Sequence, residues 1–174
     1  RQARKSNYWD NTLFLVVADH NSRVRGANLV PIEYVHILAL ILGGSVKAVT
    51  DSRLASQIDL LPTMLGLMGI DGNHPATGYD VFRPDTQDIP GRAIMQHNGT
   101  QAYMQGDEVV IMEVDKNPTL YRRTPSDLTP GEVPNPALVK RALAYSIWRA
   151  TAYQERPYRL SPPTSRHRSR DCRV

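Results

Sequence analysis

The sequence is almost without cysteine, and Cys172 carries its single thiol. One cysteine cannot form an intramolecular disulfide, nor can it supply the paired thiolates of a cysteine-based zinc site. A disulfide-stapled small domain and a zinc finger are therefore excluded. So little cysteine is compatible with both oxidising and reducing compartments, so the compartment stays open on this observation.

Long apolar runs are also missing. The longest, residues 13–18 and 37–42, fall far short of the roughly 20 residues that a membrane-spanning helix needs. The basic residues 1–5 are followed by polar residues rather than by the apolar region of a signal peptide. The first residue, Arg1, is not an initiator methionine, and we expect it to be a cut end.

Basic charge is absent from most of the chain, although the formal net charge is +4. Residues 156–174 hold six arginines and one acid, Asp171, whereas the rest holds 15 basic and 16 acidic residues. The body has no basic stripe, and no aromatic-rich platform for stacked bases is evident. We therefore expect no nucleic-acid partner for the folded part.

Several catalytic motifs are absent as well. The sequence has no Gly-rich phosphate loop, no GxSxG elbow and no Cys/His pair. No serine has an evident activating partner, so the chain shows no convincing nucleophile of its own.

The first part of the sequence predicts alternating strands and helices. Residues 13–18 and 36–42 have the continuous apolar character of fully buried strands in a parallel or mixed sheet. Residues 54–68 repeat apolar side chains at helical spacing, with Asp59 as the expected N-cap and Gly69 as the stop. This alternation predicts an α/β layered fold with the strands inside.

The second part predicts a hairpin and a helix. After a polar surface connection at residues 71–90 come a short strand at 93–96 and a hairpin around Gly106. Residues 117–134 are expected to form a long loop. Asn135 and Pro136 then have the character of a helix N-cap and first turn. The helix places one apolar face at Leu138, Ala142, Tyr145, Trp148 and Ala152.

The end of the chain offers almost nothing to bury. We predict a folded unit over residues 1–158 and a disordered basic tail over 159–174. The tail is either a basic contact segment or a non-native extension, and the sequence favours neither.

Asp19 and His20 follow the first predicted strand, at the end of the sheet where open α/β folds bind ligands. A carboxylate oxygen and an imidazole suit a divalent ion such as Zn²⁺ or Mn²⁺. Alternatively, Asp19 caps the next turn and His20 bonds a loop carbonyl. Two ligands also make an incomplete site, because metal sites normally need three or more protein ligands.

Three further residues are candidates for substrate contact. Arg23 and Arg25 follow the pair and could bind an anionic group, or they could be solvated loop arginines. His36 opens the second predicted strand and is either a site residue or a satisfied core histidine.

Four segments in this order carry a family resemblance: Asn11-Thr12 with the strand and Asp19-His20, then HILALILGG at 36–44, SQIDLLPTMLGLMGID at 56–71 and GYDVF at 78–82. Together, from about Tyr8 to Tyr158, they resemble the C-terminal part of sulfatase-like proteins of the alkaline phosphatase superfamily. The nearest resemblance is to the membrane-anchored phosphoglycerol transferase and lipoteichoic-acid-synthase-like branch. Asn21 stands where most relatives have Gly, which we take as a feature of the branch.

The resemblance implies an α/β sandwich with a mixed central sheet and a metal-dependent site at one sheet edge. In that family an Asp-His pair binds the metal, and the matching positions here are Asp19 and His20. Another acidic ligand and a Thr, Ser or formylglycine-type nucleophile would come from a missing N-terminal half. A later His ligand has a loose counterpart in His36.

The resemblance also implies a function and a location. The enzyme would attack a sulfate or phosphate ester, such as a lipid-linked or glycan ester, through a hydroxyl activated by Mn, Zn, Ca or Mg, with a covalent intermediate. It would sit in a bacterial inner membrane with its catalytic domain on the periplasmic or extracellular side. The present chain alone would be inactive. The alternative is a non-catalytic α/β interaction or assembly domain in which Asp19 and His20 are structural.

Overall fold

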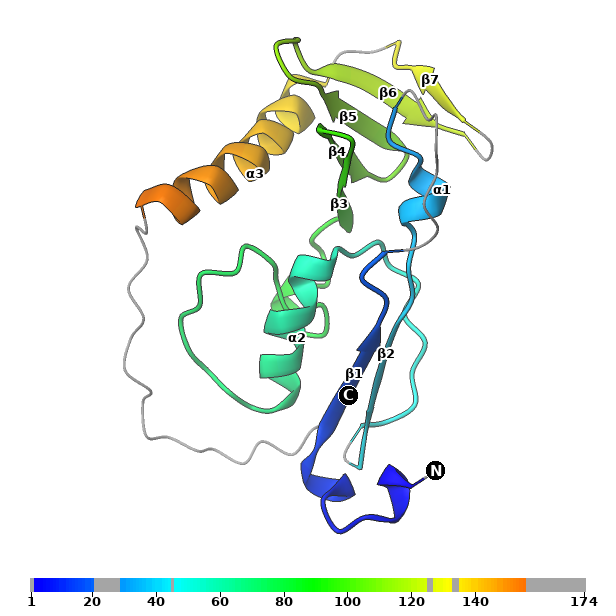
Figure 1. Ribbon diagram of the computed structural model, residues 1–174, viewed down its shortest axis with the longest axis vertical. Helices are drawn as coiled ribbons and strands as arrows, with labels where there is room; N and C mark the ends of the chain where they lie inside the picture. Colours follow the sequence, from blue (N-terminus) through cyan, green and yellow to red (C-terminus); the bar gives the residue numbers. More distant parts are fainter. Residues whose placement is uncertain (1, 21–28, 45, 125–126, 133–134, 156–174) are drawn as a thin grey trace.

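The computed structural model describes residues 2–20, 29–44, 46–124, 127–132 and 135–155. It contains two sheets and three α-helices (Figure 1). The strands are β1 (Leu13–Val17), β2 (Ala39–Gly43), β3 (Arg92–His97), β4 (Thr100–Gln105), β5 (Glu108–Met112), β6 (Thr119–Arg123) and β7 (Leu128–Pro130). The α-helices are α1 (Ile32–Val35), α2 (Leu60–Leu67) and α3 (Pro136–Glu155), with short 3-10 turns η1 (Ala3–Lys5), η2 (Trp9–Asn11), η3 (Gln57–Asp59) and η4 (Pro84–Thr86). The predicted α/β class is confirmed.

The first sheet is a two-stranded antiparallel ribbon of β1 and β2, with Val17 opposite Ala39. The apolar pattern predicted a parallel or mixed sheet, whereas the pairs of strands in both described sheets are antiparallel. The prediction that both strands are fully buried is wrong. Side chains opposite one another in such a pair share a face, and one face of this ribbon is exposed and apolar. That face, the β1–β2 strip, comprises Val16, Leu38, Leu40 and Leu42.

The predicted helix after the ribbon is present as η3 and α2. The Gly69 stop is confirmed: its φ is 68°, and the Ile70 N–H returns to the Leu65 carbonyl at 2.9 Å. The predicted apolar face is wrong in part, because Leu61 and Met68 are exposed. The helix instead buries Pro62 and Thr63.

The core lies around the five-stranded sheet, whose order is β3-β4-β5-β6-β7. Alternate residues of a strand point to opposite faces, so β4 and β5 contribute to two clusters. One cluster contains Ala102, Met104, Val109 and Ile111 and packs against residues of α1. The other joins Tyr103 and Val110 to Leu138 and Ala142 of α3. The sheet is therefore covered on one face by α3, as Figure 1 shows, and on the other by the segment that follows residue 28.

The β4–β5 hairpin and the start of α3 confirm their predictions. Gly106 adopts φ 59° in the hairpin turn, and Asn135 Oδ1 accepts a hydrogen bond from the Leu138 N–H at 3.0 Å. The loop predicted at 117–134 is wrong, because it contains β6 and β7. Pro130 is tolerated there because β7 is an edge strand, whose outer backbone needs no partner.

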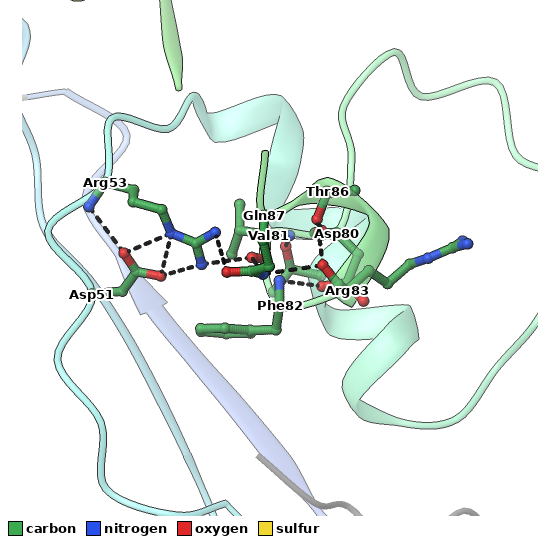
Figure 2. Close-up of polar contacts among 9 residues, drawn as sticks. Asp51, Arg53, Asp80, Val81, Phe82, Arg83, Thr86 and Gln87 are labelled. Atoms are coloured by element: carbon green, nitrogen blue, oxygen red, sulfur yellow. Dashed lines mark hydrogen bonds and ion pairs between the residues drawn. The ribbon is translucent and has the colours of Figure 1, made fainter. Parts of the chain in front are cut away.

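The polar connection 71–90 is tied down by side chains rather than by regular structure. Arg53 binds Asp51, the Val81 carbonyl and Gln87, as Figure 2 shows. Asp80, nearly buried, accepts a hydrogen bond from the Phe82 N–H at 2.9 Å. This connection is therefore less of a surface loop than its composition suggested.

None of the helices in the described ranges combines the length and apolar character that a membrane crossing requires. The predicted tail at 159–174 lies outside the described residues.

Candidate metal-binding site at the end of strand β1

Asp19 and His20 leave the end of β1 together and project into solvent. Their side chains are 88% and 61% exposed, and Asp19 Oδ2 lies 3.6 Å from His20 Nε2. The His20 backbone N–H also donates to Asp19 Oδ1 at 2.9 Å. This local hydrogen bond is consistent with a turn-capping role for Asp19. The exposed Asp19 Oδ2 and His20 Nε2, which lie close together, are consistent with a role as metal ligands. The assignment of the pair as metal ligands stays a prediction.

The donor chemistry fits a divalent ion in part. A hard carboxylate oxygen and an imidazole nitrogen side by side are acceptable ligands for Zn²⁺ or Mn²⁺. Among the described residues, however, no group of three or more His, Cys, Asp or Glu side chains could hold a metal ion. The two residues thus supply a fitting but partial donor set.

His36 lies at the same end of the ribbon as the pair. It follows α1 as its C-cap, three residues before Ala39, which pairs with Val17. Because the ribbon is antiparallel, the residues just before β2 and those just after β1 share one end of it. His36 is exposed, so its interpretation as a core histidine is wrong. Arg23 and Arg25 lie outside the described residues.

The backbone that carries the pair is held by a residue that sequence reasoning missed. The Gln57 side-chain amide donates to the Ala18 carbonyl at 2.9 Å and to the Asp19 carbonyl at 3.2 Å. An exposed glutamine at a 3-10 turn carries no sequence signal for such a contact, since the partners are 38 and 39 residues away.

A buried charge lies two residues after Gln57, at the end of η3. Asp59 was expected to cap α2, but its side chain makes no cap hydrogen bond there. Its two oxygens instead accept hydrogen bonds from Arg92 at 2.8 Å each. The Arg92 guanidinium also lies over the rings of Tyr79 and Tyr145, 4.4 and 5.1 Å from their centroids. Buried on all sides, this group is a structural centre and has no access to a substrate.

An open groove elsewhere is chemically unsuited to an ionic ester. It has a volume of about 840 Å³ and is lined by residues of α3, β6, β7 and the connection to α3, most of them apolar. None of the candidate site residues lines it.

Two comparisons with known proteins converge on one family. The sulfatase family model matches residues 1–70, the segment that contains the Asp-His pair. A crystal structure of a protein in the alkaline phosphatase superfamily from Vibrio parahaemolyticus is 36% identical and superimposes with a TM-score of 0.83. The match covers 92% of this chain and 39% of that one. The likeness extends well beyond residue 70, and the chain belongs to the sulfatase-like proteins of the alkaline phosphatase superfamily.

Proposed function

We propose that the protein is a metal-dependent hydrolase or transferase acting on sulfate or phosphate esters, with Asp19 and His20 supplying two of the metal ligands. Membership of the sulfatase-like family supports the hydrolase or transferase class. The observation that carries the ligand assignment is the side-by-side exposure of the pair at the end of β1.

The residues of this chain have distinct roles in the proposal. A bound divalent ion would stabilise negative charge on the ester and activate an oxygen nucleophile. The Asp19 carboxylate balances part of the ion's charge, and the His20 imidazole adds a neutral donor. His36, at the same end of the ribbon, and Arg23 and Arg25 are the candidates for holding the anionic ester.

The proposal requires residues beyond this chain. The pair is two ligands, and no third joins it among the described residues. The chain also spans only 39% of the length of its structural relative. We therefore place the remaining ligand and the hydroxyl nucleophile in a further, N-terminal part of the same protein. The phosphoglycerol-transferase-like branch, a lipid-linked or glycan substrate and a bacterial inner-membrane location with a periplasmic site belong to the same proposal.

Ester hydrolysis tests the proposal directly. The protein carrying its N-terminal part is assayed with p-nitrophenyl phosphate and p-nitrophenyl sulfate, with and without Mn²⁺. Asp19→Asn and His20→Ala should each abolish metal-dependent turnover of one ester. Asp127→Asn, which removes another exposed carboxylate beside β7, should leave turnover unchanged. Full activity in the Asp19 variant would refute the assignment.

A second function, a non-catalytic interaction module, is favoured by the β1–β2 strip. An apolar face of this kind is typical of a surface that another protein segment covers. In that case Asp19 and His20 are structural, and Mn²⁺ binding would be the same in wild type and His20→Ala.

A further inference from the structure

The Gln57 amide contacts the strand end where the β1–β2 ladder stops. The last backbone pair of that ladder is Val17 with Ala39, so the carbonyls of Ala18 and Asp19 lie beyond it. A side-chain amide has two N–H donors, and those of Gln57 serve these two carbonyls at 2.9 and 3.2 Å. Gln57 thus supplies hydrogen bonds to the backbone just beyond the last ladder pair, at the two residues that precede His20.

Gln57 lies at the start of η3, and hydrogen bonds of the neighbouring buried residues fix this turn. On one side of it, the Ser56 hydroxyl donates to the Arg92 carbonyl and accepts from the Ile94 N–H, both at 3.0 Å. The Ser56 N–H donates to Asp59 Oδ2 at 2.9 Å, and Asp59 is fixed by the Arg92 guanidinium. Ser56, Asp59 and Arg92 are all buried. The contacts therefore run without a gap from β3, through η3, to the backbone of Asp19.

We propose that Gln57 is a positioning residue for the divalent-ion site, holding the Ala18–Asp19 backbone so that the Asp19 and His20 side chains face one ion. The inference rests on the proposed function. Gln57 does not need to touch the ion, because it acts through two backbone carbonyls. A ligand pair on a fixed backbone loses less conformational freedom when the ion binds, and so binds it more tightly.

The substitution Gln57→Met isolates this role. Methionine is about as long as glutamine but has no N–H donor. Hydrogen bonds that orient metal ligands are typically worth 10- to 100-fold in metal affinity. Because Gln57 holds the backbone rather than the ligand atoms, we expect the low end of that range, about a tenfold weaker affinity for Mn²⁺.

The chain contains a matched control in Gln87. Its side-chain amide also donates to two backbone carbonyls, those of Val81 and Arg83, at 3.0 Å each (Figure 2). Gln87→Met removes the same kind of two-carbonyl contact from a loop that carries no candidate ligand. A purely structural role for Gln57 predicts that the two variants behave alike.

The test uses the protein carrying its N-terminal part, as in the ester assay, and two readouts. Mn²⁺ affinity is measured by water-proton relaxation, which detects weak sites, for wild type, Asp19→Asn, Gln57→Met and Gln87→Met. Deuterium exchange without metal is followed across residues 13–20. We expect Gln57→Met to weaken Mn²⁺ binding about tenfold and to speed exchange in this segment, and Gln87→Met to change neither.

The outcomes separate this inference from the proposed function. Asp19-dependent Mn²⁺ binding that is equally strong in wild type and Gln57→Met would overturn the positioning role alone. So would equal losses of affinity in the Gln57 and Gln87 variants. Binding that does not depend on Asp19, or no binding by wild type, would overturn the proposed metal ligands and the positioning role together.

Discussion

Arg92 and Asp59 form a two-point ion pair inside the protein, with both nitrogen–oxygen distances at 2.8 Å. Their side chains are 3% and 1% exposed. Burial is the largest single influence and opposes the charge on Arg92. The hydrogen bonds from Arg92 to Asp59 and the charge of that carboxylate, with a smaller contribution from Tyr145, together outweigh burial and hold the Arg92 pKa above its ordinary value. Arg92 therefore stays charged, and the pair ties η3 to the five-stranded sheet.

Breaking this pair should be costly. Arg92→Met leaves the Asp59 carboxylate buried without its partner, and we expect a loss of about 3–5 kcal/mol in the free energy of unfolding. Urea denaturation measures the loss. The double variant Asp59→Leu/Arg92→Met should lose less than the two single variants together, because no buried charge is left. A loss below about 1 kcal/mol for Arg92→Met would contradict this interpretation.

Tyr145 should contribute to the same centre through its hydroxyl. Arg92 Nε donates to this oxygen at 3.0 Å, while the ring lies over the guanidinium. Tyr145→Phe keeps the ring and removes only the acceptor. We expect a loss of about 1–2 kcal/mol by thermal or urea unfolding. An unchanged stability would show that another acceptor replaces the hydroxyl.

Gly66 should resist substitution although it lies inside α2. Alanine is favoured over glycine in a helix by about 1 kcal/mol, but a Cβ on Gly66 would overlap with the Asp80 carboxylate. Asp80 is held in place by the Phe82 N–H. Gly66→Ala should therefore destabilise the protein by about 1–3 kcal/mol.

The control for this substitution is Gly72→Ala. A Cβ there would meet no atom within 4 Å, so its effect on the free energy of unfolding should stay within about 0.5 kcal/mol. If both alanine variants unfold at the same urea concentration, the contact with Asp80 has no energetic weight.

Local chemistry explains which elements the sequence predicted well. Some roles depend only on residues nearby in the sequence, so they could be inferred from it. Examples are the positive φ of Gly69 and Gly106 and the N-cap hydrogen bond of Asn135. The ion pair of Asp59 with Arg92 joins residues 33 positions apart, and the sequence around either residue does not indicate it.

Burial was predicted less well, because it depends on what packs against an element. The apolar runs of β1 and β2 indicated strands correctly but could not show that one face is exposed. The strand β6 was missed because only Leu120 and Tyr121 in it carry apolar bulk, and its pairing with β5 supplies the rest. For the site, the sequence identified Asp19 and His20 but not Gln57, whose contact is long-range.

The acid dependence of stability should include a contribution from Asp80. Burial raises its pKa above the ordinary 3.8, although the Phe82 N–H and Arg83 act in the opposite direction. The folded state therefore holds this proton more tightly than the unfolded chain. The favourable contribution is fully present below about pH 3.8 and is lost as the pH rises through the raised pKa.

Asp80→Asn tests this sign, because asparagine does not titrate. Urea denaturation of both proteins should show that the free energy of unfolding of the variant rises relative to that of wild type between about pH 3.5 and about pH 7. If wild type instead becomes more stable relative to the variant over the same pH interval, the folded state lowers the Asp80 pKa.

The β1–β2 strip should make the chain associate with itself at high concentration. Its apolar side chains lie beside strand edges that pair with no further strand among the described residues, and both features favour intermolecular contact. Val16→Thr replaces a strip residue that is 57% exposed, so the fold should tolerate it, and association should weaken in sedimentation velocity. Val114→Thr is the matched control, since Val114 is 74% exposed and lies outside the strip. Equal sedimentation of both variants would mean that the strip does not mediate self-association. Weaker association of Val16→Thr alone would place the contact on the ribbon that also carries Asp19 and His20.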